Sequence, residues 1–159
     1  MSIEKVRAYF AQAGIENRIL EFPVSSATVE LAALALNTEP CRIAKTLSFA
    51  VGERTVLVVT AGDAKVNNGK FKARFGVKAK MLSREEAEEK IGHAVGGVCP
   101  FAVKEGVEVY LDESMKRFST VFPACGSSNS AIELTIPELE EHARCDAWVD
   151  VCKGWREGN

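Results

Sequence analysis

The feature that most constrains this chain is a pair of apolar segments joined by a three-residue polar turn. Leu47, Phe49 and Val51 alternate with smaller residues, Gly52-Glu53-Arg54 makes the turn, and residues 55–60 are apolar or β-branched on both faces. Alternation predicts a strand with one buried face, and the second segment predicts a strand at the centre of a sheet. Because the connection is too short for a crossover, the two strands are expected to form an antiparallel hairpin.

The remaining pattern predicts helices and strands interspersed along the chain. Gly14 ends the first apolar periodicity as a C-cap, and Ser83 to Glu86 form a capping box. We expect helices at residues 3–13, 29–36, 67–75, 83–91 and after Thr135, and further strands at 18–22, 107–111, 120–122 and 131–136. Two strand connections are too short for a parallel crossover, which predicts an α+β fold with a mixed, mostly antiparallel sheet flanked by helices. With no repeat or dividing linker, residues 1–159 are expected to be one domain.

Composition excludes several broad classes. The chain is 47% hydrophobic and 26% charged, which is ordinary for a globular protein and unlike a disordered one. Its first residues carry frequent charges, unlike a signal peptide, and its longest apolar runs are far shorter than a membrane span. We therefore expect a cytoplasmic protein without a membrane partner.

The cysteines and histidines do not form a recognisable metal or disulfide pattern. The five cysteines are an odd number without a C-x-x-C pair, and nothing in the sequence pairs them with His93 or His142. Motifs for nucleotides, serine hydrolases and zinc proteases are also absent. The prediction is reduced thiols, no metal and no cofactor, and a thiol hydrolase or redox protein using Cys99 or Cys125 is kept as an alternative.

A basic segment lies in the middle of the chain, although the formal net charge is −2. Residues 65–80 contain no Asp or Glu and hold five candidate contacts to nucleic-acid phosphates, Lys70, Lys72, Arg74, Lys78 and Lys80. An acidic stretch follows directly at residues 85–89. The segment is either a patch that contacts phosphates or the solvated face of a helix.

One lysine and two glycine loops are the candidates for chemistry. Lys45 shares its strand parity with Leu47, Phe49 and Val51, so its side chain is expected on their side of the strand. There it either extends its ammonium to the rim or holds an anionic or carbonyl oxygen in a pocket. Residues 96–101 and 124–130 form small-residue loops that either present backbone N–H groups to a ligand or are plain turns.

Taken in order, the motifs resemble the YbaK family of aminoacyl-tRNA deacylases and the editing insertion of bacterial prolyl-tRNA synthetases. The resemblance runs without interruption from about Glu4 to Ala143. It is carried by Arg42-Ile43-Ala44-Lys45-Thr46-Leu47, Gly62-Asp63-Ala64-Lys65-Val66, Gly96-Gly97-Val98-Cys99-Pro100-Phe101, Tyr110-Leu111-Asp112-Glu113-Ser114, and Cys125-Gly126 before Ile132-Glu133-Leu134.

The resemblance implies hydrolysis of the ester that joins a wrong amino acid to the 3′ end of a tRNA, without a metal or a protein nucleophile. By similarity, Lys45 matches the essential lysine of the family, and Gly96 with Pro100 matches its G-x-x-x-P loop. The substrate-binding residues it implies are Thr46, Gly96, Gly97, Val98, Cys99, Pro100, Phe101, Gly126 and Ser127. The absence of a catalytic triad agrees, because positioned donors alone supply much of a rate enhancement.

The expected substrate is tRNA, chiefly tRNA for proline, carrying alanine, serine, threonine or cysteine, and an aminoacyl-tRNA synthetase such as prolyl-tRNA synthetase is the candidate protein partner. Some family members carry a histidine or arginine after the glycine that matches Gly126, whereas this chain has Ser127, Ser128 and Asn129. The alternative is a module that binds aminoacyl-tRNA or a synthetase without turnover.

Overall fold

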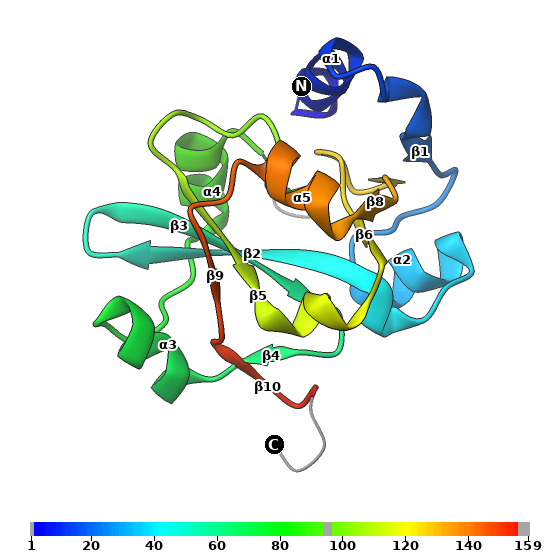
Figure 1. Ribbon diagram of the computed structural model, residues 1–159. Coiled ribbons are helices and arrows are strands. Elements are labelled where there is room, and N and C mark those ends of the chain that lie inside the picture. Colours follow the sequence, from blue (N-terminus) through cyan, green and yellow to red (C-terminus); the bar gives the residue numbers. More distant parts are fainter. Residues whose placement is uncertain (1, 94–96, 156–159) are drawn as a thin grey trace.

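The computed structural model describes residues 2–93 and 97–155. Its centre is the predicted antiparallel hairpin of β2 and β3, in which Lys45 lies opposite Thr60 and Val51 opposite Arg54. A mixed six-stranded sheet grows outward from the hairpin in the order β8-β6-β2-β3-β5-β9 (Figure 1). The strands are β2 (Ile43–Val51), β3 (Arg54–Ala61), β5 (Glu108–Asp112), β6 (Thr120–Pro123), β8 (Leu134–Thr135) and β9 (Ala147–Val149).

Antiparallel and parallel pairing are both present, and the predicted α+β class with a mixed sheet is confirmed. The pairs β2–β3 and β6–β8 are antiparallel, while β2–β6, β3–β5 and β5–β9 are parallel. Two short antiparallel ladders complete the structure. They join β1 (Leu20–Glu21) to β7 (Ser130–Ala131) and β4 (Lys65–Val66) to β10 (Cys152–Lys153).

Local capping chemistry fixes most of the helix boundaries. Thr28, Asn67, Ser83 and Thr135 each accept a hydrogen bond from a first-turn backbone N–H, as N-cap residues do. Short 3₁₀ turns lie at residues 16–18, 40–42 and 113–117. The helices are α1 (Ser2–Gln12), α2 (Val29–Leu36), α3 (Asn68–Phe75), α4 (Arg84–Ile91) and α5 (Ile136–Ala143).

Two predicted strands differ from the structure. The strand expected at 18–22 is reduced to β1, because Arg18 ends a 3₁₀ turn and its guanidinium binds the Glu138 carboxylate at 2.8 and 3.0 Å. The strand expected at 131–136 is divided into β7 and β8, and Ile136 already begins α5. Between them Ile132 donates its backbone N–H to the carbonyl oxygen of Pro123 at 3.1 Å, which holds this segment against β6.

Aromatic contacts show which side of the hairpin α3 covers. The Phe49 ring lies 4.8 Å from that of Phe71, which in turn lies 4.6 Å from Phe75. Phe10 of α1 packs instead against Phe101 and His142. Because Lys45 and Phe49 share strand parity, Lys45 leaves β2 on the side covered by α3.

Within residues 2–93 and 97–155, none of the helices has the length and apolar character required to cross a membrane.

Candidate functional site

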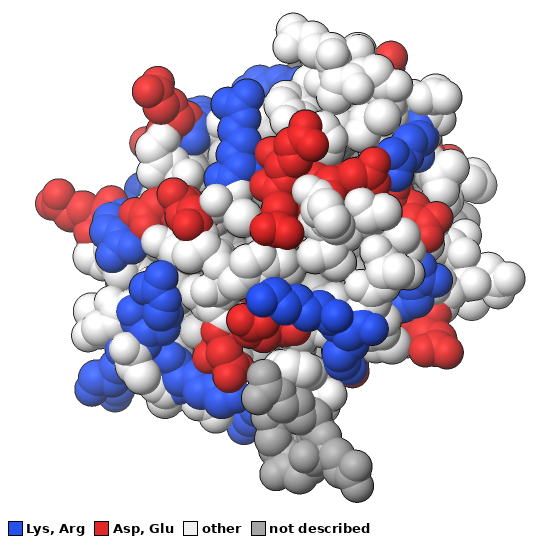
Figure 2. Space-filling view, viewed as in Figure 1, with Lys and Arg blue, Asp and Glu red and all other residues white. Residues whose placement is uncertain are grey.

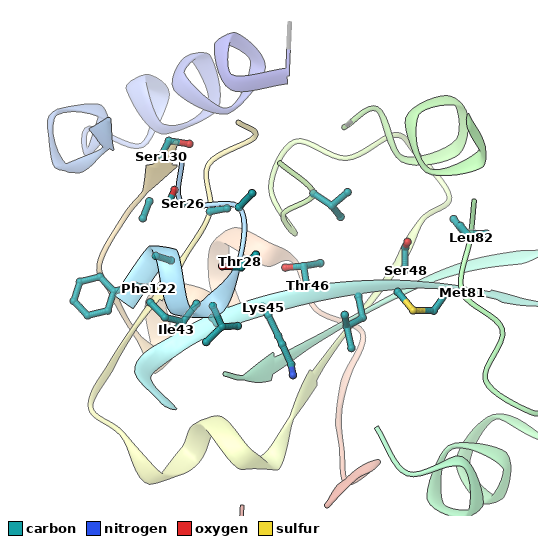
Figure 3. A pocket seen from close by; sticks show the side chains of 18 of the residues that line it. Ser26, Thr28, Ile43, Lys45, Thr46, Ser48, Met81, Leu82, Phe122 and Ser130 are labelled. Carbon is teal, nitrogen blue, oxygen red and sulfur yellow. The ribbon is translucent and has the colours of Figure 1, made fainter. Parts of the chain in front are cut away.

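A cavity of about 470 Å³ lies beside the part of β2 that has no neighbouring strand on the side away from β3 (Figure 3). Strand β6 pairs with β2 only at Ile43 and Ala44. At the other end, Leu82 donates its backbone N–H to the carbonyl oxygen of Ser48 at 3.1 Å, and Ala50 donates to Lys80 at 2.8 Å. We call the segment between these pairings, residues 45–47, the open edge of β2.

The cavity wall is mainly apolar with several hydroxyl groups. Thr46 and Ser48 come from β2, Thr28 caps α2, and Val98 and Ala124 come from the two small-residue loops. The remaining lining residues are Ser26, Ala27, Val29, Ala32, Ile43, Ala44, Lys45, Leu47, Met81, Leu82, Arg84, Phe122, Ser130 and Ala131. A space of this size is within the range of pockets that bind small molecules.

Lys45 and Thr46 leave β2 on opposite sides, as Figure 3 shows. The Lys45 side chain is half-buried, and burial lowers its pKa from the ordinary lysine value of 10.5. Asp63, Glu30 and Cys152 oppose this shift, while Lys65 adds to it. In the described part of the chain its ammonium makes no hydrogen bond or ion pair. Lys45 therefore lines the cavity as a cation that is available to a ligand.

Thr46 carries a buried hydroxyl on the other side of the strand. Its Oγ1 has no hydrogen-bond partner among the described residues. Two other cavity hydroxyls have partners: Ser130 accepts from Ser127 at 2.7 Å, and Ser26 donates to the Ser128 carbonyl at 3.3 Å. An orphaned buried hydroxyl is uncommon in folded proteins, which marks Thr46 as a polar group within the cavity wall.

The two glycine loops are in direct backbone contact. A Cβ placed on Gly97 would lie 2.8 Å from the carbonyl carbon and oxygen of Gly126 and from the amide nitrogen of Ser127. Gly126 has a φ of +93°, in the region that favours glycine. Glycine is therefore required at Gly97 by close approach and favoured at Gly126 by conformation.

The structure divides the sequence-predicted binding residues into two groups. Lys45, Thr46 and Val98 line the cavity, whereas Gly97, Cys99, Pro100, Phe101, Gly126 and Ser127 do not. Cys99, Pro100 and Phe101 are buried, and Cys99 and Phe101 belong to the hydrophobic core. Gly96 lies outside the described residues.

The thiols are poorly suited to nucleophilic chemistry. Burial raises the pKa of Cys99 to about 12 and that of Cys125 well above its usual range. The structure does bring His93 to 3.6 Å from Cys99 Sγ, a pairing that the sequence gave no signal for. The same Nε2 lies 2.7 Å from the carbonyl oxygen of Phe101, so it donates to that oxygen and cannot accept the thiol proton.

The basic segment is only partly available to a ligand. Lys70 binds Asp150 at 3.2 Å and the Cys152 carbonyl oxygen at 2.9 Å, and Arg74 stacks on the rings of Phe75 and Tyr110. Lys72, Lys78 and Lys80 are exposed. Figure 2 shows basic side chains gathered over α3 and its surroundings, at the lower left of the view.

Sequence reasoning missed the hydroxyls of Ser26 and Ser48 and the cation Arg84 as cavity residues, whereas Ser130 belongs to the candidate loop at residues 124–130. Ser26 belongs to the Ser25–Thr28 run, whose polar character was visible in the sequence as a helix start. The others come from separate elements, and only the tertiary fold assembles them. Among residues 2–93 and 97–155, the structure contains no group of three or more His, Cys, Asp or Glu able to hold a metal ion.

Comparison with known proteins gives the family. The family model for the aminoacyl-tRNA editing domain matches residues 24–142, well over half of the chain. The chain belongs to this editing-domain family. The match contains the residues that line the cavity, Lys45 among them, and both glycine loops.

Relatives and solved structures agree with this assignment. The chain is 54% identical over 156 residues to "Uncharacterized protein YwhH" of Bacillus subtilis (strain 168), covering 98% of this chain and 99% of that protein. A crystal structure described as "a putative trans-editing enzyme for prolyl tRNA synthetase" has a TM-score of 0.86 and 27% identity, covering 96% of this chain and 98% of that one.

Proline–tRNA ligases are related through one segment. The chain is 29% identical over 130 residues to the enzyme of Bacillus cytotoxicus and 32% identical over 125 residues to that of Bacillus velezensis. These matches cover 81% and 78% of this chain but 22% of each ligase. The shared part is thus about a fifth of the ligase length.

Proposed function

We propose that this protein is an aminoacyl-tRNA deacylase that removes a small, wrongly attached amino acid from tRNA, chiefly tRNA for proline. The observation that carries the proposal is the cavity at the open edge of β2, where a half-buried lysine borders a small, hydroxyl-bearing space. Family membership and the similarity to proline–tRNA ligases support the substrate class.

In the proposed reaction, a water oxygen adds to the ester carbonyl carbon, and the ester oxygen then leaves with a proton as the ribose hydroxyl. Charge develops on the carbonyl oxygen in the first step. The Lys45 ammonium, uncommitted among the described residues, orients the ester and stabilises that charge. No side chain acts as nucleophile, in agreement with the raised pKa values of Cys99 and Cys125.

The cavity wall sets the size of the amino acid. Ala32, Ala124 and Ala131 together with Val29 and Val98 leave room for a small side chain, while Phe122 and Ile43 limit the space for a longer one. The proposal therefore covers alanine, serine, threonine and cysteine as the misattached residues. The tRNA body would lie along the exposed lysines Lys72, Lys78 and Lys80.

The test is a deacylation screen with purified protein and tRNA for proline, charged in turn with alanine, serine, threonine, cysteine and proline. We expect hydrolysis of at least one small mischarged species and little hydrolysis of the correct prolyl ester. Saturable binding of aminoacyl-tRNA with no hydrolysis across the set would instead support the alternative, a binding module without turnover.

A further inference from the structure

The open edge of β2 exposes main-chain hydrogen-bonding groups as well as side chains. In an antiparallel hairpin, alternate residues direct their N–H and C=O groups to the partner strand, and the intervening residues direct theirs away. Ser48 and Ala50 bond to the 80–82 segment, so the even-numbered residues of β2 face away from β3. Thr46 must therefore direct its N–H and C=O toward the cavity.

No neighbouring strand uses these two groups of Thr46. A further parallel bond from Thr46 to β6 would pair Lys45 with Ala124, but the ladder ends with Ala44 opposite Pro123. On the other side, the ladder with residues 80–82 begins only at Ser48. Across the described part of the chain, no recorded hydrogen bond reaches the Thr46 N–H or C=O. Thr46 is partly exposed in the cavity wall, so its main-chain groups can take their hydrogen-bond partner from water or from a ligand in the cavity.

An aminoacyl group has the geometry of such a partner. It carries a nitrogen, one α-carbon and a carbonyl, the same sequence of atoms as one residue of a strand. We propose that the aminoacyl group pairs with Thr46 as a one-residue antiparallel strand. Its α-ammonium donates to the Thr46 carbonyl oxygen, and the Thr46 N–H donates to the ester carbonyl oxygen.

This pairing places each part of the substrate. Directly opposed residues in an antiparallel pair carry their side chains on the same side of the sheet, so the amino-acid side chain lies beside Thr46. The aminoacyl group runs against the direction of β2, so the ester oxygen and the ribose that follow its carbonyl lie beside Lys45 on the open edge. The opposite orientations of Lys45 and Thr46 thus serve different parts of the substrate.

Two consequences follow for recognition. The Thr46 N–H is a fixed donor aimed at the oxygen where negative charge develops, as an oxyanion-hole group is. The site also selects the L configuration, because a D-aminoacyl group held by the same two bonds would turn its side chain to the Lys45 side. The inference rests on the proposed function, since it assumes that an aminoacyl ester enters this cavity.

The main test uses the wild-type protein and a non-hydrolysable probe, 3′-(L-alanylamino)-3′-deoxyadenosine, followed by amide NMR. We expect the Thr46 amide proton to shift downfield and its hydrogen exchange to slow by tenfold or more. The L-lactyl counterpart, which lacks the α-ammonium, should bind about tenfold or more weakly, as loss of a charge-assisted bond predicts. The D-alanyl probe should leave the Thr46 amide unprotected.

Variants separate the main chain from the side chain. Thr46→Val keeps both main-chain groups, so the L-alanyl probe should still protect the amide of residue 46. Thr46→Pro removes an N–H on the unpaired side of β2, where proline is tolerated as on an edge strand, and should lower turnover about 10²-fold or more relative to Thr46→Val. Leu47→Pro, which removes an N–H directed at β3, should instead unfold the protein.

The outcomes distinguish the two levels of the argument. Protection of the Thr46 amide without hydrolysis of any aminoacyl-tRNA would overturn the proposed function and keep this pairing. Hydrolysis by the wild type with an unprotected Thr46 amide, or equal affinity for the alanyl and lactyl probes, would overturn the pairing.

Discussion

The location of Lys45 affects both the stability of the folded state and the proposed reaction. Its half-buried position lowers the pKa because burial disfavours the charged form. Burial also removes part of the water that would otherwise compete with a substrate oxygen for the ammonium. The same environment therefore reduces folding stability and strengthens the interaction with developing negative charge.

The first prediction is that Lys45→Met lowers single-turnover deacylation by about 10² to 10³, the usual value of a positioned charged donor. Between the lowered folded pKa and 10.5, the unfolded chain binds more protons, so unfolding free energy rises with pH in wild type. The variant should lose that rise with pH, and its unfolding free energy at neutral pH should differ from that of wild type by less than about 1 kcal/mol.

Urea unfolding as a function of pH measures this stability effect, and Lys5→Met, at an exposed position that does not line the cavity, is the control. A loss of rate of tenfold or less, or one that the unfolded fraction explains, would remove Lys45 from the mechanism.

Gly97 gives the second prediction. In Gly97→Ala, the new methyl group would meet the backbone of Gly126 and Ser127 at 2.8 Å. Backbone cannot move as a flexible side chain does, so we expect a loss of about 1 to 3 kcal/mol in unfolding free energy and a marked loss of deacylation. The control is Gly69→Ala in α3, where the nearest atom is the Asn67 side-chain oxygen at 3.2 Å. That change should be neutral or stabilising, and equal melting temperatures for both variants would contradict the prediction.

Among the elements, those with strong local signals were predictable. The hairpin followed from its alternation and short turn, and α4 followed from the capping box that the structure contains at Ser83. Helix α5 followed from the start signal at Thr135, where the structure also forms a capping box. Strands β4, β9 and β10 are only two or three residues long and were not predicted. Their pairing partners lie far away in the sequence, so periodicity carries no trace of them.

In the candidate site too, features with a local sequence signal were predictable, and features that depend on distant segments were not. Strand parity correctly placed Lys45 on the side of Phe49, and the resemblance joined it to Thr46 and Val98, which line the cavity. The contact between Gly97 and Gly126 could not be read from spacing, because it depends on how two distant loops pack. The open edge of β2 was equally invisible, since it arises where β6 ends its pairing at Ala44.

The basic segment around α3 carries the third prediction. Lys72, Lys78 and Lys80 are exposed, whereas Lys70 and Arg74 already have partners within the protein. The triple variant with Gln at positions 72, 78 and 80 should weaken tRNA binding and reduce the slope of log affinity against log salt by roughly 0.7 to 0.9 for each true contact.

The comparison for this segment is Lys70→Gln, which should change the salt slope much less. Binding measured between low and moderate salt decides the matter. An unchanged affinity and slope in the triple variant would show that this segment is a solvated face.

On the scale of the whole molecule, the fourth prediction is that activity does not require a metal ion. The described residues hold no cluster of His, Cys, Asp or Glu suitable for one, and the proposed mechanism uses a cation and main-chain donors in place of a Lewis acid. Prolonged treatment with EDTA should leave the deacylation rate within about twofold of the untreated enzyme. Loss of activity that zinc restores would show that the mechanism is wrong.

The last prediction concerns the thiols, which are distributed over the molecule. It tests the alternative of a thiol hydrolase or redox protein that uses Cys99 or Cys125. Cys99 and Cys125 are fully buried and their pKa values are raised, so neither forms the thiolate that reacts with electrophiles at neutral pH. Cys41 and Cys145 are partly exposed and do not line the cavity.

Brief iodoacetamide treatment of the folded protein should therefore modify at most the partly exposed cysteines and leave deacylation nearly unchanged. Mass spectrometry identifies the modified positions, and the urea-unfolded protein serves as the control in which all five cysteines react. Inactivation that tracks alkylation of Cys99 or Cys125 in the folded state would require a thiol mechanism.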